Sequence, residues 1–179
     1  MATYQYKLPF ELLSRRAREL TTGWELSGIT RISTGFPVSI HSDQDNSFQG
    51  SVPNGVNNKS LDLPDRLQGP LNLNGDPRNG LEYFNKSLFV PNAPGTPGTA
   101  SRRAFYGPGT LNFDLALLKS FRIRESLSAQ LRLESFNTFN HAQFFGPAAV
   151  NGDADSDLFG YVVKAAPPRL MQVALKLTF

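Results

Sequence analysis

The chain has 179 residues, 18 basic and 15 acidic side chains, two histidines and a formal net charge of +3. This length fits one domain or a piece of a larger one, and the interleaved charges form no basic stripe of the kind that binds nucleic acid. The chain contains no cysteine, which excludes disulfides, thiolate metal sites and cysteine nucleophiles, and no apolar run approaches the ~18 residues of a transmembrane helix.

The first residues carry no basic segment followed by an apolar one, so they do not form a secretory signal peptide. Residues 3–10 place Tyr4, Tyr6 and Leu8 at alternate positions, which predicts the end of a β-strand. Residues 11–23 suit either a turn or one to two turns of amphipathic helix.

The longest strand is predicted at residues 22–40. From Trp24 to Ile40 every second side chain is apolar or uncharged, whereas Glu25 and Arg31 fall at the intervening positions. Because the side chains of a strand point alternately to its two faces, this strand is predicted to have one uncharged face and one polar face.

Alternation returns in the second half of the chain. Residues 111–121 and 127–139 predict a β-hairpin with a short turn, and residues 169–179 predict a last strand. A terminal aromatic preceded by apolar residues at every second position is the signal that outer-membrane barrels present to the barrel-assembly machinery. Here that signal would consist of Met171, Val173, Leu175, Leu177 and Phe179.

Two long stretches break the alternation. Residues 41–110 are rich in Pro, Gly and Asn, and residues 141–168 are also irregular. Such a long connection is uncommon in a compact soluble domain but ordinary for an extracellular barrel loop. If Phe179 lies at the periplasmic end, both stretches fall outside the cell and the shorter connections fall in the periplasm, as is usual for barrels.

These features predict an all-β fold, an antiparallel transmembrane β-barrel segment of about five or six strands with long extracellular loops. The alternative is a soluble, secreted all-β module that binds carbohydrate or protein, because the strands of a β-sandwich also alternate. The uncharged strand faces and the long loop favour the barrel.

Several stretches, in this order and spacing, resemble the C-terminal barrel region of TonB-dependent outer-membrane receptors of the Oar-like group. They are Tyr6–Phe10, Gly23–Ile29 running into Ser33–Pro37, Gly107–Leu115 running into Lys119–Phe121, Leu133–His141 and Pro168–Phe179. The resemblance covers nearly the whole chain. It implies a barrel of about 22 strands in the bacterial outer membrane, with its lumen filled by a plug domain.

The resemblance also implies energy-coupled uptake of a ligand such as a siderophore, glycan or peptide. A signal peptide, the plug and the rest of the barrel are missing, so residues 1–179 are expected to be the C-terminal part of a longer receptor. The expected partners are outer-membrane lipid, the barrel-assembly machinery, the remaining barrel and plug, and the TonB energy-coupling complex through the missing N-terminal parts. Neither a cofactor, nor enzymatic activity, nor a nucleic-acid partner is expected.

The polar strand faces are predicted to line the lumen. Their candidate residues are Glu25, Arg31, Asp114, Gln130, Arg132, Glu134, Gln172 and Lys176. The alternative is that these side chains pair across neighbouring strands, or with the plug, and touch no ligand.

Recognition of a ligand is predicted for the long loop 41–110, because outer loops commonly carry that role. The candidates for contact with an anion or a glycan are Arg102, Arg103, Phe105 and Tyr106. The alternative for these four residues is packing within the loop.

Two motifs carry metal-binding residue types. Residues 153–157 hold three aspartates at alternate positions, but an EF-hand needs Gly and Glu where this chain has Leu158 and Lys164. That excludes an EF-hand and leaves weak surface binding of calcium open. His41 and His141 are far apart in the sequence, which excludes a His-rich site. No metal ligand is therefore assigned.

Overall fold

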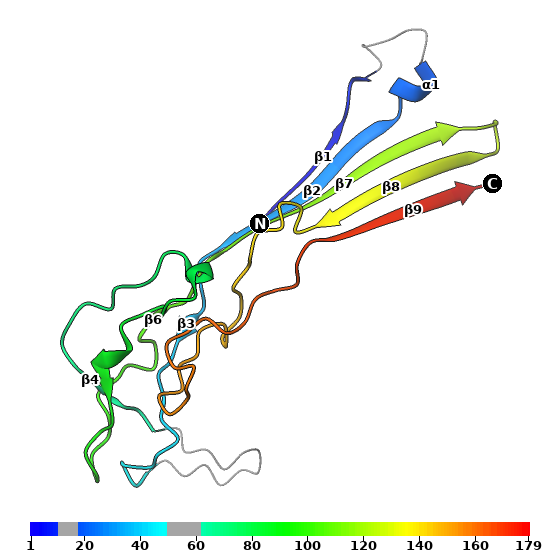
Figure 1. Ribbon diagram of the computed structural model, residues 1–179. Coiled ribbons are helices and arrows are strands. Elements are labelled where there is room, and N and C mark those ends of the chain that lie inside the picture. The colour runs from blue at the N-terminus through cyan, green and yellow to red at the C-terminus, as the bar shows by residue number, and fades with distance from the viewer. Residues whose placement is uncertain (11–17, 50–61) are drawn as a thin grey trace. The chain divides into compact units, whose positions relative to one another are not determined.

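The computed structural model describes residues 1–10, 18–49 and 62–179, which form two compact units (Figure 1). The strand unit comprises residues 1–33, 111–143 and 167–179, and the loop unit comprises residues 34–110 and 144–166. Of the predicted turn or helix at 11–23, residues 11–17 lie outside the described residues, and Arg18–Thr21 form one helical turn, α1.

The strand unit is one five-stranded antiparallel sheet with the order β1-β2-β7-β8-β9. The all-β, antiparallel prediction is therefore confirmed. The strands are β1 (Ala2–Lys7), β2 (Trp24–Ser33), β7 (Thr110–Arg122), β8 (Ser128–Phe136) and β9 (Leu170–Thr178).

The strand predicted at 22–40 is too long, because β2 ends at Ser33. Pro37–Val38 form a separate strand, β3, which pairs with β6 (Phe105–Tyr106) in the loop unit. Between them the chain passes against another backbone, where a Cβ at Gly35 would lie 1.7 Å from the carbonyl oxygen of Gly107. Only glycine permits that approach. The alternation of side-chain types in the sequence therefore runs on to Ile40, although β2 itself ends at Ser33.

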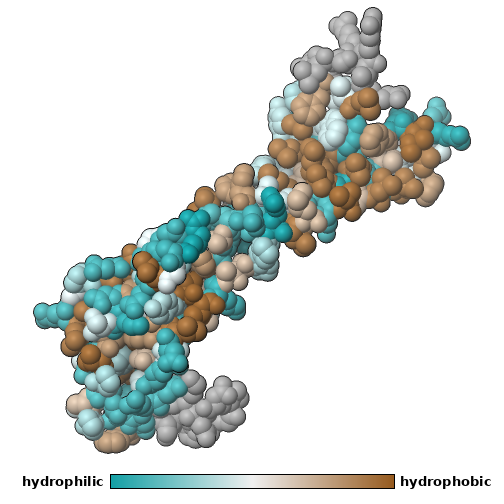
Figure 2. All heavy atoms as spheres, in the orientation of Figure 1, coloured by the Kyte–Doolittle hydropathy of each residue, from teal (hydrophilic) through white to brown (hydrophobic). Residues whose placement is uncertain are grey.

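The registers of β7, β8 and β9 align apolar side chains in some rows across the three strands and mainly polar side chains in the rows between them. One row joins Leu117, Leu133 and Val173, and the next residues along form a row of Ala116, Glu134 and Gln172. Rows of the first kind make an apolar face, and rows of the second kind make a polar face. The residues of β9 are exposed on both faces, and apolar side chains gather at the surface over the sheet in Figure 2.

Lys119 is the charged residue among these paired apolar positions. It pairs with Leu131, yet its side chain is only 2% exposed. Its Nζ donates to the carbonyl oxygen of Thr22 and lies 5.5 Å from the ring centroid of Trp24 and 4.9 Å from that of Phe121. Aromatic rings and a carbonyl thus surround the ammonium group, which is how a lysine is accommodated on an apolar surface.

The loop unit has a hydrophobic core of its own. It contains short strands and 3-10 helices: β3, β4 (Asp65–Arg66), η2 (Pro77–Asn79), η3 (Lys86–Leu88), β5 (Phe89–Val90) and β6. Phe84 is 1% exposed, and its ring centroid lies 4.7 Å from that of Phe105, 5.4 Å from that of Phe159 and 5.6 Å from that of Phe89. The two stretches predicted as irregular loops therefore pack together into one compact unit.

Replacing Phe84 with alanine is expected to destabilise the loop unit by about 3–5 kcal/mol, because it removes the ring at the centre of this core. The measurement is the free energy of opening from hydrogen exchange at the amide of Tyr83, which donates to the carbonyl oxygen of Gly160 at 2.7 Å. Leu81→Ala is the control, since that side chain is 64% exposed. Equal effects of the two substitutions would contradict the core described here.

Candidate functional site

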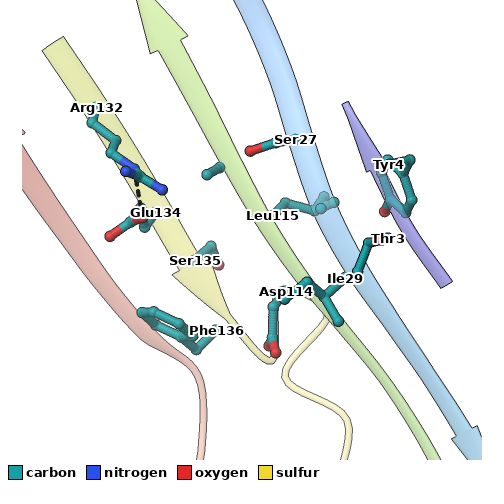
Figure 3. A pocket seen from close by; sticks show the side chains of 12 residues that line it. Thr3, Tyr4, Ser27, Ile29, Asp114, Leu115, Arg132, Glu134, Ser135 and Phe136 are labelled. Carbon is teal, nitrogen blue, oxygen red and sulfur yellow. Dashed lines mark ion pairs between the residues drawn. The ribbon is translucent and has the colours of Figure 1, made fainter. Parts of the chain in front are cut away.

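A hollow of about 300 Å³ lies in the sheet of the strand unit, bounded by β1, β2, β7 and β8 (Figure 3). Ser27 and Ala116 of the central strands have small side chains, and longer side chains surround the space. The lining residues are Thr3, Tyr4, Ser27, Gly28, Ile29, Asp114, Leu115, Ala116, Arg132, Glu134, Ser135 and Phe136. Three predicted lumen residues, Asp114, Arg132 and Glu134, are therefore brought together.

The charges beside this hollow are paired with one another. Arg132 Nε lies 2.6 Å from Glu134 Oε1, and Gln172 Nε2 donates to Glu134 Oε2 from the neighbouring strand. Glu134 is half-buried, so this network fixes its carboxylate more firmly than a fully exposed ion pair would. Ile29 and Phe136 lie toward one end of the hollow with Asp114 between them, and the Arg132–Glu134 pair lies on β8 (Figure 3).

Asp114 holds a turn as well as lining the hollow. Its Oδ1 accepts hydrogen bonds from Asn112 Nδ2 at 2.9 Å and from the backbone N–H of Asn137 at 2.8 Å. Asn137 has φ 51° and comes directly after β8, so the carboxylate stabilises the turn that ends this strand.

The other predicted lumen residues lie elsewhere on the polar face. Gln5 Nε2 donates to Glu25 Oε1 at 2.5 Å, and Gln130 is paired in register with Lys176. Arg31 is exposed near the end of β2. These residues are spread along the sheet and do not converge on one point. The contacts of Gln5 with Glu25 and of Gln172 with Glu134 are cross-strand pairs, as in the alternative that the sequence left open, whereas Arg132 and Glu134 pair within β8.

The loop residues proposed for ligand contact separate into two groups. Arg102, Arg103 and Tyr106 are exposed. Phe105 is 7% exposed and packs against Phe84 in the core, so its prediction as a ligand contact is wrong. The cause is the strand alternation in β6, which turns Phe105 inward and leaves Tyr106 outside.

A second cavity, of about 560 Å³, lies within the loop unit and is lined by Arg102, His41 and Asp62, among others. Asp62 is buried and accepts hydrogen bonds from the backbone N–H of Ser47 at 2.8 Å, that of Leu63 at 2.9 Å and Asn92 Nδ2 at 3.1 Å. Burial alone raises the pKa of Asp62, but these hydrogen bonds outweigh it and hold the pKa below its ordinary value.

The structure also joins two motifs that the sequence left apart. One ligand atom each from His41, Asp43 and Asp153 lies within 4.8 Å of the others. Asp153 belongs to the aspartate run 153–157, and His41 and Asp43 belong to a segment more than a hundred positions earlier. No local pattern could have indicated this juxtaposition, because it depends on the packing of the loop unit.

The apolar residues of β9 lie in rows with those of β8. Leu175 pairs with Leu131 and Leu177 pairs with Ala129. Met171, Val173, Leu175, Leu177 and Phe179 are all exposed. No helix in the described part of the chain is both long and apolar enough to cross a membrane.

Comparison with known families accounts for this two-faced sheet. A family model described as "Outer membrane beta barrel domain" matches residues 1–172. The chain belongs to this outer membrane beta barrel domain family. Membership places the barrel domain in the bacterial outer membrane, in a family whose domains are typically not enzymes. Neither the curated proteins nor the solved structures gave a match.

Asp62→Ala is expected to weaken the protection of the Ser47 and Leu63 amides against hydrogen exchange by about 1–3 kcal/mol at neutral pH, since both lose their acceptor. Because the pKa of Asp62 is lowered in the folded state, its contribution to stability is complete above the ordinary carboxyl pKa. The contribution is lost only as the pH falls through the lowered value. The measurement is amide exchange of both residues over a series of acidic pH values.

The control is Asp157→Ala, which removes an exposed carboxylate from the same barrel domain. This variant should leave both amides protected. If the Ser47 and Leu63 amides of the unchanged protein lost their protection well above the ordinary carboxyl pKa, the Asp62 carboxylate would not be the cause of that protection.

Proposed function

We propose that this barrel domain is part of the wall of a TonB-dependent, Oar-like receptor that takes up a ligand across the outer membrane. One observation carries the proposal: the registers place charged and amide side chains in rows on one sheet face and aliphatic side chains on the other. An outer-membrane barrel needs a predominantly apolar face toward lipid and accommodates charge most readily toward its lumen. The hollow beside Arg132 and Glu134 then opens toward the transport path.

The ends of the sheet support a larger closed assembly. β1 and β9 are its end strands, and unpaired backbone groups in lipid cost several kcal/mol each. In the proposal, further strands of the same barrel pair with both, a plug domain fills the lumen, and the TonB complex couples energy through that plug. The exposed row ending at Phe179 is the segment offered to the barrel-assembly machinery.

The loop unit is assigned to the outer surface. With the last strand running inward, the stretches 41–110 and 141–168 both emerge outside the cell. Their shared core gives a rigid base, and the exposed Arg102, Arg103 and Tyr106 remain candidates for contact with a ligand. This arrangement favours recognition at the loops, followed by passage along the polar face, and no chemical conversion of the ligand.

The assignment of the two faces can be tested with single spin labels, because the chain has no cysteine of its own. Val173→Cys and Gln172→Cys place labels at adjacent positions of β9 on opposite faces. In lipid vesicles, the label at 173 should collide mainly with dissolved oxygen, and the label at 172 mainly with a water-soluble nickel complex. Water exposure of both labels would contradict the barrel wall and favour the soluble binding module.

Receptor and open pore can be distinguished by electrical conductance. A barrel whose lumen is closed by a plug should carry no steady ion current in a planar bilayer, whereas an open porin-like barrel of the same family should. The protein that carries this chain is inserted into the bilayer and the current is recorded at constant voltage. A steady current would contradict the plugged receptor while leaving the face assignment intact.

A further inference from the structure

We propose that the loop unit holds a site for a divalent transition-metal cation of the zinc type, with His41, Asp43 and Asp153 as its protein ligands. One ligand atom from each side chain lies within 4.8 Å of the others, and all three residues are half-buried. This inference concerns the loop unit alone, so it does not depend on whether the barrel is a TonB-dependent receptor or a pore.

Backbone contacts bring the two segments of the site together. The N–H of His41 donates to the carbonyl oxygen of Gly152 at 2.9 Å, and the N–H of Ala154 donates to that of His41 at 2.8 Å. These bonds form a parallel bridge between His41 and Asp153. A Cβ at Gly152 would lie 2.1 Å from the carbonyl oxygen of Ser39, so a glycine is required for the segments to approach this closely.

A neighbouring aspartate, Asp155, forms hydrogen bonds to both of these segments. Asp155 Oδ2 accepts hydrogen bonds from Ser42 Oγ and from the N–H of Asp43, both at 2.7 Å, and Oδ1 accepts one from Gln44 Nε2 at 2.9 Å. The N–H of Asp155 in turn donates to Asp153 Oδ1 at 3.1 Å. Asp155 is therefore a positioning residue, which orients the backbone that carries each ligand carboxylate.

The donor atoms decide the kind of cation. Two carboxylates this close repel each other, and a divalent cation between them would offset that repulsion. Calcium and magnesium take oxygen ligands, whereas zinc binds imidazole nitrogen together with carboxylate oxygen at about 2.0–2.2 Å. Such bonds place neighbouring donor atoms roughly 3.0–3.6 Å apart, so modest side-chain rotations would close the set around one ion.

The consequence of binding would be a cross-link within the loop unit. His41 and Asp43 follow β3, whereas Asp153 lies in the segment that contributes Val150 and Phe159 to the core. A shared ion would tie these distant parts of the chain together and stabilise the loop unit by the free energy of binding. Three protein ligands would leave a tetrahedral ion one position for water.

The test is a titration of the full chain in detergent micelles with zinc chloride, followed by calorimetry and by the ring ¹⁵N resonances of the two histidines. Saturable binding of one ion is expected, with His41 shifted and His141 unchanged. His41→Gln and Asp153→Asn should each weaken binding at least about tenfold. Asp153→Asn retains the oxygen that accepts the Asp155 N–H, so the loop should stay folded.

Matched controls are available in the same chain. His141→Gln changes the other histidine, and Asp157→Asn changes an exposed aspartate of the same run; neither should alter zinc affinity. Unchanged affinity in His41→Gln, a zinc-induced shift of His141 instead of His41, or absence of saturable binding would each overturn the proposal. Tighter binding of calcium than zinc, insensitive to His41→Gln, would also overturn it.

Discussion

The strand unit depends on one constraint, the pairing of backbone N–H and C=O groups between neighbouring strands in a fixed register. In lipid these backbone groups have no other hydrogen-bond partner, because water is absent. A shift of one residue would exchange the two faces of a strand and place Arg132 or Glu134 among the aliphatic rows. The rows from β7 through β8 to β9 keep the same parity throughout, so side-chain sorting follows directly from backbone pairing.

The described backbone groups of the loop unit form their hydrogen bonds mainly in turns and short bridges, not in a long sheet. In its described residues, the strands β3 to β6 have two residues each, and many of the hydrogen bonds join turns and isolated bridges. Stability comes instead from the aromatic cluster around Phe84 and from buried acceptors such as Asp62. The barrel domain thus combines a sheet stabilised by register with a loop base stabilised by a small core.

The sequence indicated the five strands of the sheet because alternation of side chains is a local signal, present in each of these stretches. It failed at the end of β2, where the alternation runs past Ser33 although close backbone contact at Gly35 ends the strand. It failed again for Phe105, whose burial depends on contacts with Phe84 and Tyr83. The meeting of His41 with Asp153 was equally out of reach, because it depends on loop packing and on no periodic pattern.

The long sequence separations within the loop core affect how the chain is made and exported. Ile40, Phe84 and Phe105 can complete their packing only after Val150 and Phe159 have been synthesised and brought alongside. Contacts between residues that are far apart in the sequence form slowly. Until they form, the apolar side chains are exposed and can associate with other chains. During transit to the outer membrane, the core side chains between residues 83 and 105 therefore stay open to association until residues 150–159 have arrived beside them.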